Sequence, residues 1–274
     1  ETPVLTARFM VVEPHVEMKC GATSKTDIDA ERTHQQVDIN ISYPQFNISQ
    51  PSTDLKVVVW QNRRLDNMVE IDTPSFYEGR SVNYKLNHDL IFEAGNEFRT
   101  FDISSKYVLD KDVYRFEYFK PYYHVTLFPS EFRSKKQYES WQTANGRFVP
   151  NYQGSDYPDI EADYAFVHFT LPTDEPWLDG KVYILSEGTE YKFTDTNQMH
   201  YNYETQEYEG LLFLKMGGYN YQYLYVPNGT SVGHTAPVEG DFWQTGNEYA
   251  VFTYFHPFGS LYDMLIGYWI GYFK

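Results

Sequence analysis

Two groups of alternating acidic residues are the first candidates for chemistry, because several carboxylate oxygens around one point bind calcium. They lie in the segments TDIDAE and PDIEADY and comprise Asp27, Asp29 and Glu31 in the first and Asp159, Glu161 and Asp163 in the second. Neither group has the glycine and distal glutamate of an EF-hand loop. A solvated acidic loop explains both groups, so the sequence predicts no metal site.

Catalytic motifs are missing from the sequence. It has no G-x-S-x-G, no H-E-x-x-H and no glycine-rich phosphate loop, and its eight histidines are scattered without ligand spacing. Carboxylates are abundant, but glycoside hydrolysis needs two of them at a set separation across a cleft. We therefore expect no enzyme and no cofactor.

The segment QNRRLDN, at the end of an expected strand, is the clearest candidate for contact with another protein. Arginine is favoured at protein interfaces. The candidate partner-binding residues are Gln61, Asn62, Arg63, Arg64, Asp66 and Asn67. The alternative is that the segment only closes a β-turn.

A second segment, NEFRTFD, would place Glu97 and Arg99 on one strand face, as a partly buried ion pair or as a partner-facing patch.

The segment GGYNYQYLYV places Tyr219, Tyr221, Tyr223 and Tyr225 at every second position. In an extended strand these rings point the same way. Either they form one wall of a core or they form an exposed platform, and we expect a core. The opposite face, Asn220, Gln222, Leu224 and Val226, is then the candidate contact surface.

Composition limits the classes of function. Aromatic residues make up 19% of the 274 residues, which favours strands, and the net charge is −16. Nucleic-acid binding requires a basic surface, so we expect none. A single cysteine, Cys20, excludes an internal disulfide. The longest apolar stretch near the end, LIGYWIGYF, is shorter than the ~20 residues of a membrane helix, so we expect no membrane insertion.

Period-2 patterns dominate, as in VDINIS, RFEYF and ADYAFVHFTL, and turn signals such as EAGN and PNG separate them. This predicts an all-β protein of two consecutive antiparallel β-sandwich domains. The proline-rich and acidic stretch 151–161 is the expected linker, between domains at 1–150 and 162–274. The one expected helix is SEFRSKKQYESW, residues 130–141.

Several segments together resemble the plug-protein family of the bacterial type IX secretion system. They are ARFMVVE (7–13), VVVWQNRRLDN (57–67), AGNEFRTFD (94–102), NGRFVP (145–150), DYAFVHFTL (163–171), YEGLLFLKMGGYNYQY (208–223) and GSLYDMLIGY (259–268). The resemblance implies consecutive sandwich domains in a periplasmic protein, associated with the outer membrane. It also implies docking on the periplasmic mouth of an outer-membrane translocon barrel, which the protein would close. Family members usually have a signal peptide and a further N-terminal region. ETPVLTARFMVVEP contains no signal peptide, so we expect a mature or trimmed chain.

The second expected domain also resembles early-set immunoglobulin-like modules, among them glycogen-binding domains. Sugar-binding members place a tryptophan after the first turn and a lysine between later aromatics, where this chain has Tyr191 and Gln222. A carbohydrate-binding module of the cell envelope is therefore the alternative function. The possible sugar-binding residues are Trp177, Tyr191, Gln222 and Trp243. The leading expectation is a non-enzymatic periplasmic protein that seals or regulates the translocon through a broad surface.

Overall fold

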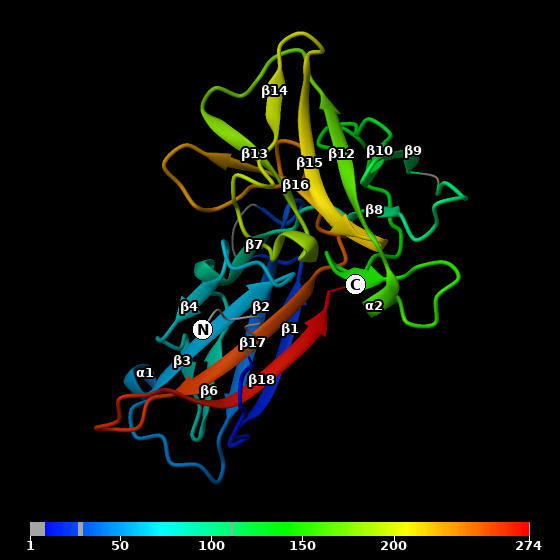
Figure 1. The fold of residues 1–274 in the computed structure, drawn as a ribbon. Coiled ribbons are helices and arrows are strands. Elements are labelled where there is room, and N and C mark those ends of the chain that lie inside the picture. Colours follow the sequence, from blue (N-terminus) through cyan, green and yellow to red (C-terminus); the bar gives the residue numbers. More distant parts are fainter. Residues whose placement is uncertain (1–8, 27–29, 111, 274) are drawn as a thin grey trace.

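The computed structural model describes residues 9–26, 30–110 and 112–273, and it consists of two β-rich lobes (Figure 1). The prediction of an all-β protein built from sandwiches is confirmed, since four sheets carry almost all of the regular structure. Within the described ranges, no helix is both long and apolar enough to cross a membrane.

The lower lobe packs two sheets face to face. The first sheet contains β1 (Glu17–Thr23), β2 (His34–Ser42), β5 (Phe76–Tyr77), β6 (Ser81–Tyr84) and β7 (Ile91–Glu93). The second contains β3 (Leu55–Gln61), β4 (Val69–Ile71), β17 (Glu248–Phe255) and β18 (Met264–Tyr272). As the alternation in VDINIS predicts, Val37, Ile39 and Ile41 are fully buried between them. Burying each such side chain contributes about 1.5–3 kcal/mol.

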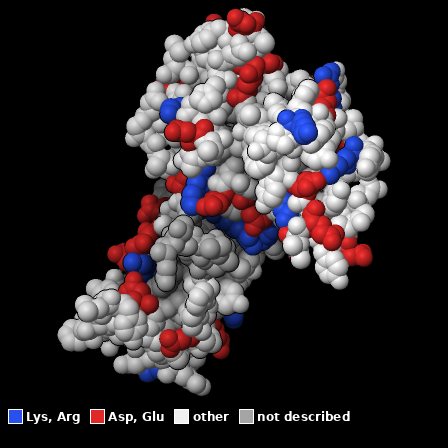
Figure 2. Space-filling view, in the orientation of Figure 1, with Lys and Arg blue, Asp and Glu red and all other residues white. Residues whose placement is uncertain are grey.

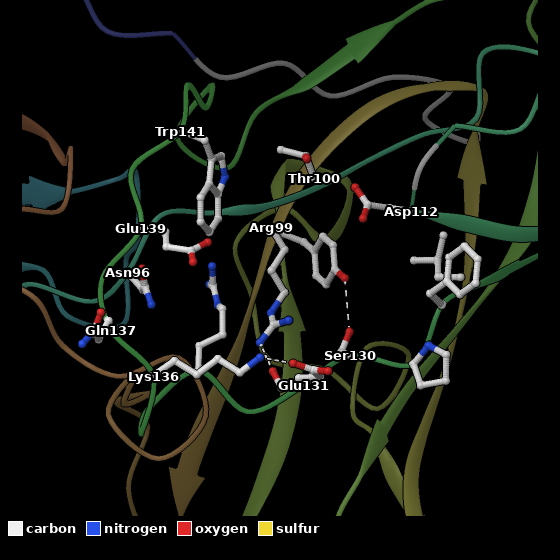
Figure 3. Close-up of a pocket in the computed structure, with 15 residues that line it drawn as sticks. Asn96, Arg99, Thr100, Asp112, Ser130, Glu131, Lys136, Gln137, Glu139 and Trp141 are labelled. Atoms are coloured by element: carbon white, nitrogen blue, oxygen red, sulfur yellow. Dashed lines mark hydrogen bonds and ion pairs between the residues drawn. The ribbon is translucent and has the colours of Figure 1, made fainter.

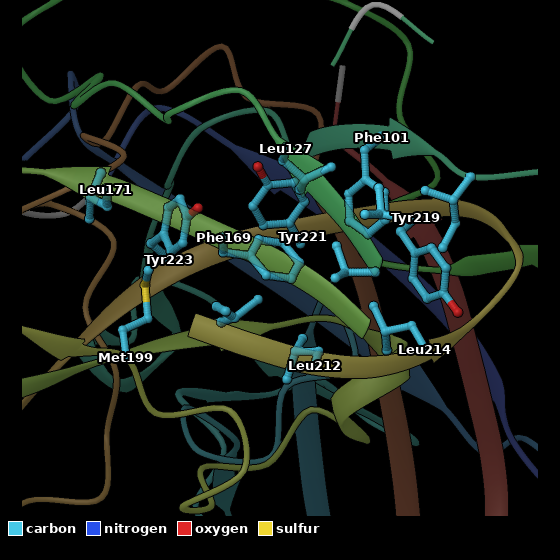
Figure 4. Close-up of a cluster of buried hydrophobic side chains, with 14 of the residues drawn as sticks. Phe101, Leu127, Phe169, Leu171, Met199, Leu212, Leu214, Tyr219, Tyr221 and Tyr223 are labelled. Carbon is cyan, nitrogen blue, oxygen red and sulfur yellow. The ribbon is translucent and has the colours of Figure 1, made fainter. Parts of the chain in front are cut away.

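The upper lobe is a second sandwich with a core rich in aromatic rings (Figure 4). One sheet has the order β14 (His200–Asn202), β15 (Glu207–Lys215), β12 (Tyr164–Pro172), β10 (Tyr122–Leu127) and β9 (Val113–Phe119). The other contains β8 (Arg99–Asp102), β11 (Phe148–Pro150), β13 (Gly180–Leu185) and β16 (Gly217–Pro227). The pair β10–β12 is parallel, unlike the antiparallel pairing predicted.

The two lobes do not divide the chain at the expected linker. Strand β17 pairs with β3, so residues 248–272 complete the lower lobe, and the upper lobe is inserted between β7 and β17. Instead of separating two domains, residues 151–161 lie within the upper lobe and hold the short helix α2 (Pro158–Glu161). The expected boundaries were wrong because the β3–β17 pairing joins segments almost 190 residues apart, and local composition carries no trace of such a pairing.

The four-tyrosine row of β16 is core, as expected. Tyr219, Tyr221, Tyr223 and Tyr225 are all buried, and Tyr223 is fully enclosed. The opposite face was expected to be a contact surface, but Asn220, Gln222, Leu224 and Val226 are buried as well. Loops cover it: the Gln222 side-chain amide donates to the Asn96 carbonyl at 2.6 Å. Strand β16 is therefore a central strand buried on both faces.

The helix expected at 130–141 does not form, and this segment runs as a loop with a turn. Its side chains bond elsewhere in the upper lobe: the Trp141 indole donates to the Phe98 carbonyl and Arg133 binds Glu239. These tertiary bonds override a weakly amphipathic pattern. The remaining helical turns are α1 (Pro51–Asp54), η1 (His88–Leu90) and η2 (Glu187–Thr189).

Candidate functional site: a buried junction, a polar pocket and an exposed aromatic face

The segment QNRRLDN forms a tight turn between the lobes. Asn62 and Arg63 adopt the left-handed conformation, with φ of 50° and 61°. Gln61, Asn62 and Arg64 are each at most 4% exposed. The expected partner-binding residues are therefore mostly enclosed, and the alternative of a structural turn describes them better.

Arg64 explains much of this burial. Its guanidinium donates to both carboxylate oxygens of Asp66, at 3.0 and 2.5 Å, and to the carbonyl of Gly233 at 2.6 Å. The Asp66 carboxylate in turn accepts the Gly233 amide at 2.9 Å. Gly233 belongs to the upper lobe, so this buried ion pair fastens the turn of one lobe to a loop of the other.

Side-chain amides make a second link across the junction. Asn62 donates to the Asn247 side chain at 2.7 Å, and its own side-chain oxygen accepts from Asn145 at 3.2 Å. Asn67 donates to Gln61 at 2.9 Å. Because Asn62, Asn145 and Asn247 are buried and bonded to one another, they fix the two lobes as one body and are not free for a partner.

Arg63 is the exception, with a side chain 44% exposed and 3.6 Å from carboxylate oxygens of Glu187 and Glu248. On the face drawn in Figure 2, acidic and basic side chains lie next to one another along the waist between the lobes.

The possible sugar-binding residues do not form one site. Trp177 packs on Tyr208 and Tyr225 at the margin of the upper core. Tyr191 lies against Gly146, and its hydroxyl is enclosed without a hydrogen-bond partner. Gln222 is buried, and Trp243 is 40% exposed on a loop. The expected shared sugar platform is therefore not present in the described part of the chain.

The expected pair of Glu97 and Arg99 does not form either. Arg99 binds Glu239 at 3.0 Å instead, and Arg133 binds the other oxygen of the same carboxylate at 2.7 Å. We call Arg99, Arg133 and Glu239 the arginine–glutamate cluster. Burial alone would raise the pKa of Glu239, but the charges of both arginines outweigh it and the pKa is lowered. Glu97 accepts the Tyr138 hydroxyl at 2.6 Å.

Above this cluster lies a pocket with a cavity volume of about 450 Å³ (Figure 3). Its wall combines the Trp141 ring with the polar side chains of Asn96, Gln137 and Glu139. Its cations are balanced: Arg99 binds Glu239, and Lys136 forms an ion pair with Glu131. The pocket is therefore polar and close to electrically neutral, with one large aromatic ring.

The outer face of the β9–β10–β12–β15 sheet carries a continuous patch of rings. Tyr122, Tyr164, Leu211 and Phe213 are between 46% and 49% exposed, and Phe119 is 57% exposed. The half-buried side chains of His124, Phe166 and His168 lie among them. We call these eight residues the aromatic face. Large apolar side chains grouped on a solvent-facing sheet are unusual in a monomer and indicate a contact surface.

The rings of the aromatic face pack on one another. The ring centres of Phe166 and Phe213 lie 4.7 Å apart. The Tyr122 ring contacts both edge-on, with an angle of 84° between its plane and each of theirs. Parts of this face were visible in the sequence, because Phe166 and His168 alternate with buried residues in ADYAFVHFTL. The sequence did not show that four strands align their side chains on this face, since that depends on the register of β9 against β10 and of β10 and β15 against β12.

The acidic segments show no metal site. Asp27 and Asp29 lie outside the described residues. Asp163 forms an ion pair with Lys106 at 2.6 Å, and the Asp159 carbonyl accepts from Lys215. Among residues 9–26, 30–110 and 112–273, no three His, Cys, Asp or Glu side chains are grouped so as to hold a metal ion.

Comparison with solved structures gives an informative likeness. A hypothetical protein from Parabacteroides merdae ATCC 43184, known from its crystal structure, superposes with a TM-score of 0.93 at 42% sequence identity. The superposition covers 95% of this chain and 66% of that one, so this chain spans just under two thirds of its length. No protein-family model matches the chain. A comparison with curated proteins also gives no match.

Proposed function

We propose that this protein is a non-enzymatic interaction protein of the periplasm. In this proposal it docks through the aromatic face onto an outer-membrane translocon barrel of the type IX secretion system and seals or regulates it. The observation that carries the docking surface is the exposure of grouped rings on a sheet face that nothing else in the described chain covers. The identity of the translocon comes from the sequence resemblance.

A protein partner suits the aromatic face better than a glycan does. Sugars stack on rings that present a broad flat face, whereas Tyr122 stands edge-on to Phe166 and Phe213. Phe119, Phe166 and Phe213 have no polar group with which to bind hydroxyls. Grouped aromatic side chains surrounded by polar ones are typical of the centre of a protein interface.

The rigid junction supports the same function. A protein that closes a pore by surface fit has to keep its shape under load, and the buried Arg64–Asp66 pair joins the lobes across their contact. Preorganisation of this kind lowers the entropic cost of docking.

The test is affinity isolation of the full-length protein from envelope extract, with the double substitution Tyr164→Thr and Phe213→Thr. Threonine keeps strand propensity while removing both exposed rings. We expect recovery of the translocon barrel to fall by about tenfold or more, because aromatic residues at interface centres each contribute more than about 1 kcal/mol.

The matched control is Phe76→Thr with Tyr77→Thr, which removes two rings that are 53% and 57% exposed on the edge strand of the lower lobe. This variant should recover the barrel like the unsubstituted protein. Equal recovery by both variants would exclude the aromatic face as the docking site. Failure of the unsubstituted protein to recover any barrel would overturn the proposed function itself.

The polar pocket favours carbohydrate binding as a second candidate function. A neutral pocket that combines one tryptophan with amide and paired charged side chains suits the hydroxyls and apolar ring face of a neutral sugar. If this holds, calorimetry with neutral oligosaccharides should detect binding that Gln137→Ala weakens. Gln142→Ala, next to Trp141 but outside the pocket wall, should leave it unchanged. An equal effect of the two substitutions, or no binding at all, would reject this candidate.

A further inference from the structure

Two histidines meet in the middle of the aromatic face. His124 lies on β10 and His168 on β12, which run parallel, with His124 opposite Phe166 and Thr126 opposite His168. The two imidazoles are therefore diagonal neighbours on one face. Nδ1 of His124 lies 3.0 Å from Nε2 of His168.

Aromatic neighbours fix the orientation of the His124 ring. It stacks on Phe166 with 5.2 Å between ring centres, and Phe119 contacts it edge-on at 5.4 Å. Since the two nitrogens already face each other at 3.0 Å and the His124 ring is held by its neighbours, little side-chain entropy of His124 remains to be lost when a ligand binds there.

The surroundings of His168 also suit a metal ligand. Burial, and then the charge of His124, lower the pKa of His168. Both effects favour the neutral imidazole, which is the form that binds metals. The carboxylate of Glu209, on β15, adds negative charge nearby.

We propose that His124 and His168 form a two-ligand site for a divalent transition-metal ion. Metal–nitrogen bonds of about 2.05 Å to two nitrogens 3.0 Å apart enclose an angle of about 95° at the ion. That angle fits adjacent positions of square-planar or octahedral coordination, which Cu²⁺ and Ni²⁺ prefer, and it is narrower than the tetrahedral angle of zinc. In a neutral pair one of the two facing nitrogens carries the shared proton. When the ion binds, that proton moves to the outer nitrogen of its own ring, so the ion takes two neutral imidazoles and no net proton is released.

Water fills the other positions of the site, because the described chain groups no third His, Cys, Asp or Glu with this pair. The ion is therefore accessible, and it would lie at the centre of the aromatic face. This inference does not depend on the proposed docking, since it concerns the metal alone.

The experiment is a calorimetric titration of the chain, freed of any affinity tag, with CuCl₂, NiCl₂ and ZnCl₂ at pH 7.5. We expect one site, with affinity in the order Cu²⁺ above Ni²⁺ and Zn²⁺. Loss of an outer-shell partner lowers metal affinity roughly 10–100-fold. Replacing a ligand itself, as in His124→Gln or His168→Gln, should lower the affinity for Cu²⁺ by more than that. His200→Gln, on the edge strand β14 of the same sheet, is the matched control and should bind like the original.

Electron paramagnetic resonance of the Cu²⁺-loaded protein provides a readout that does not depend on any substitution. Two equatorial nitrogens should split the copper signal. Copper binding that survives both His124→Gln and His168→Gln would overturn the site, as would a spectrum with only oxygen ligands. In that event the 3.0 Å contact is an ordinary hydrogen bond between the two imidazoles.

Discussion

Replacing Glu239 by glutamine is expected to lower the free energy of unfolding by about 3–5 kcal/mol, the cost of breaking a buried ion pair by removing one partner. The carboxylate of Glu239 is fully buried, and the side chains of Arg99 and Arg133 are each only 12% exposed. Glutamine keeps the shape and can still accept the Tyr223 amide. It removes the only charge that these two guanidinium groups share. Urea unfolding followed by tyrosine and tryptophan fluorescence measures the change.

Glu131→Gln is the matched control, because Glu131 lines the same pocket but its side chain is 72% exposed. Exposed ion pairs contribute little, so this substitution should change stability by less than about 1 kcal/mol. Equal effects of Glu239→Gln and Glu131→Gln would contradict the importance of the arginine–glutamate cluster.

The same cluster makes the stability of the protein fall at acid pH. Because the folded pKa of Glu239 lies below its unfolded value, its contribution to stability is fully present above the unfolded pKa and is lost as pH falls through the folded pKa. The stability difference between the original protein and Glu239→Gln should therefore shrink on acidification below about pH 4.5. A difference that stayed constant down to pH 3 would show that the charge of Glu239 is not the cause.

Replacing Arg64 by alanine is expected to lower the free energy of unfolding by about 3–5 kcal/mol, because it leaves the Asp66 charge enclosed without its counter-ion. The Asp66 side chain is 6% exposed, and Arg64 also donates to the Gly233 carbonyl of the other lobe. Limited proteolysis should cut near the waist faster in this variant, in addition to the loss seen in urea unfolding.

Its neighbour provides the control. Arg63→Ala alters the adjacent residue of the same turn, but the Arg63 side chain is 44% exposed and its ion contacts are at 3.6 Å. We expect this substitution to lower the free energy of unfolding by less than about 1 kcal/mol. If Arg63→Ala were the more damaging substitution, the junction described above would be wrong.

Much of the fold was predictable because it depends on local pattern. The period-2 alternation in VDINIS predicted which residues enter the core, and the four-tyrosine row was predicted to be buried; the structure buries both sets, although it also buries the opposite face of β16. What the pattern could not show is pairing between distant strands. The β3–β17 pairing, which moves the domain boundary, involves no local signal in either segment.

The candidate sites were predicted less well, for a related reason. Arg64 in QNRRLDN looks like a surface residue until the upper lobe covers it, and Gln222 looks like a contact residue until a loop crosses β16. Conversely, the aromatic face arises from four strands whose register no single segment specifies. Polar residues at lobe junctions and apolar residues on outer sheet faces are the two cases where residue type gives the wrong location.

The insertion of one lobe into the other has a consequence for synthesis. A ribosome releases residues 94–247 before it makes β17, so the upper sandwich has its whole sequence while the lower one still lacks two strands. Until β17 arrives, β3 has one open edge and a half-formed core, which is a state prone to aggregation. The sandwich that contains the earlier strands is thus the later one to close, and its closure depends on β17 and β18.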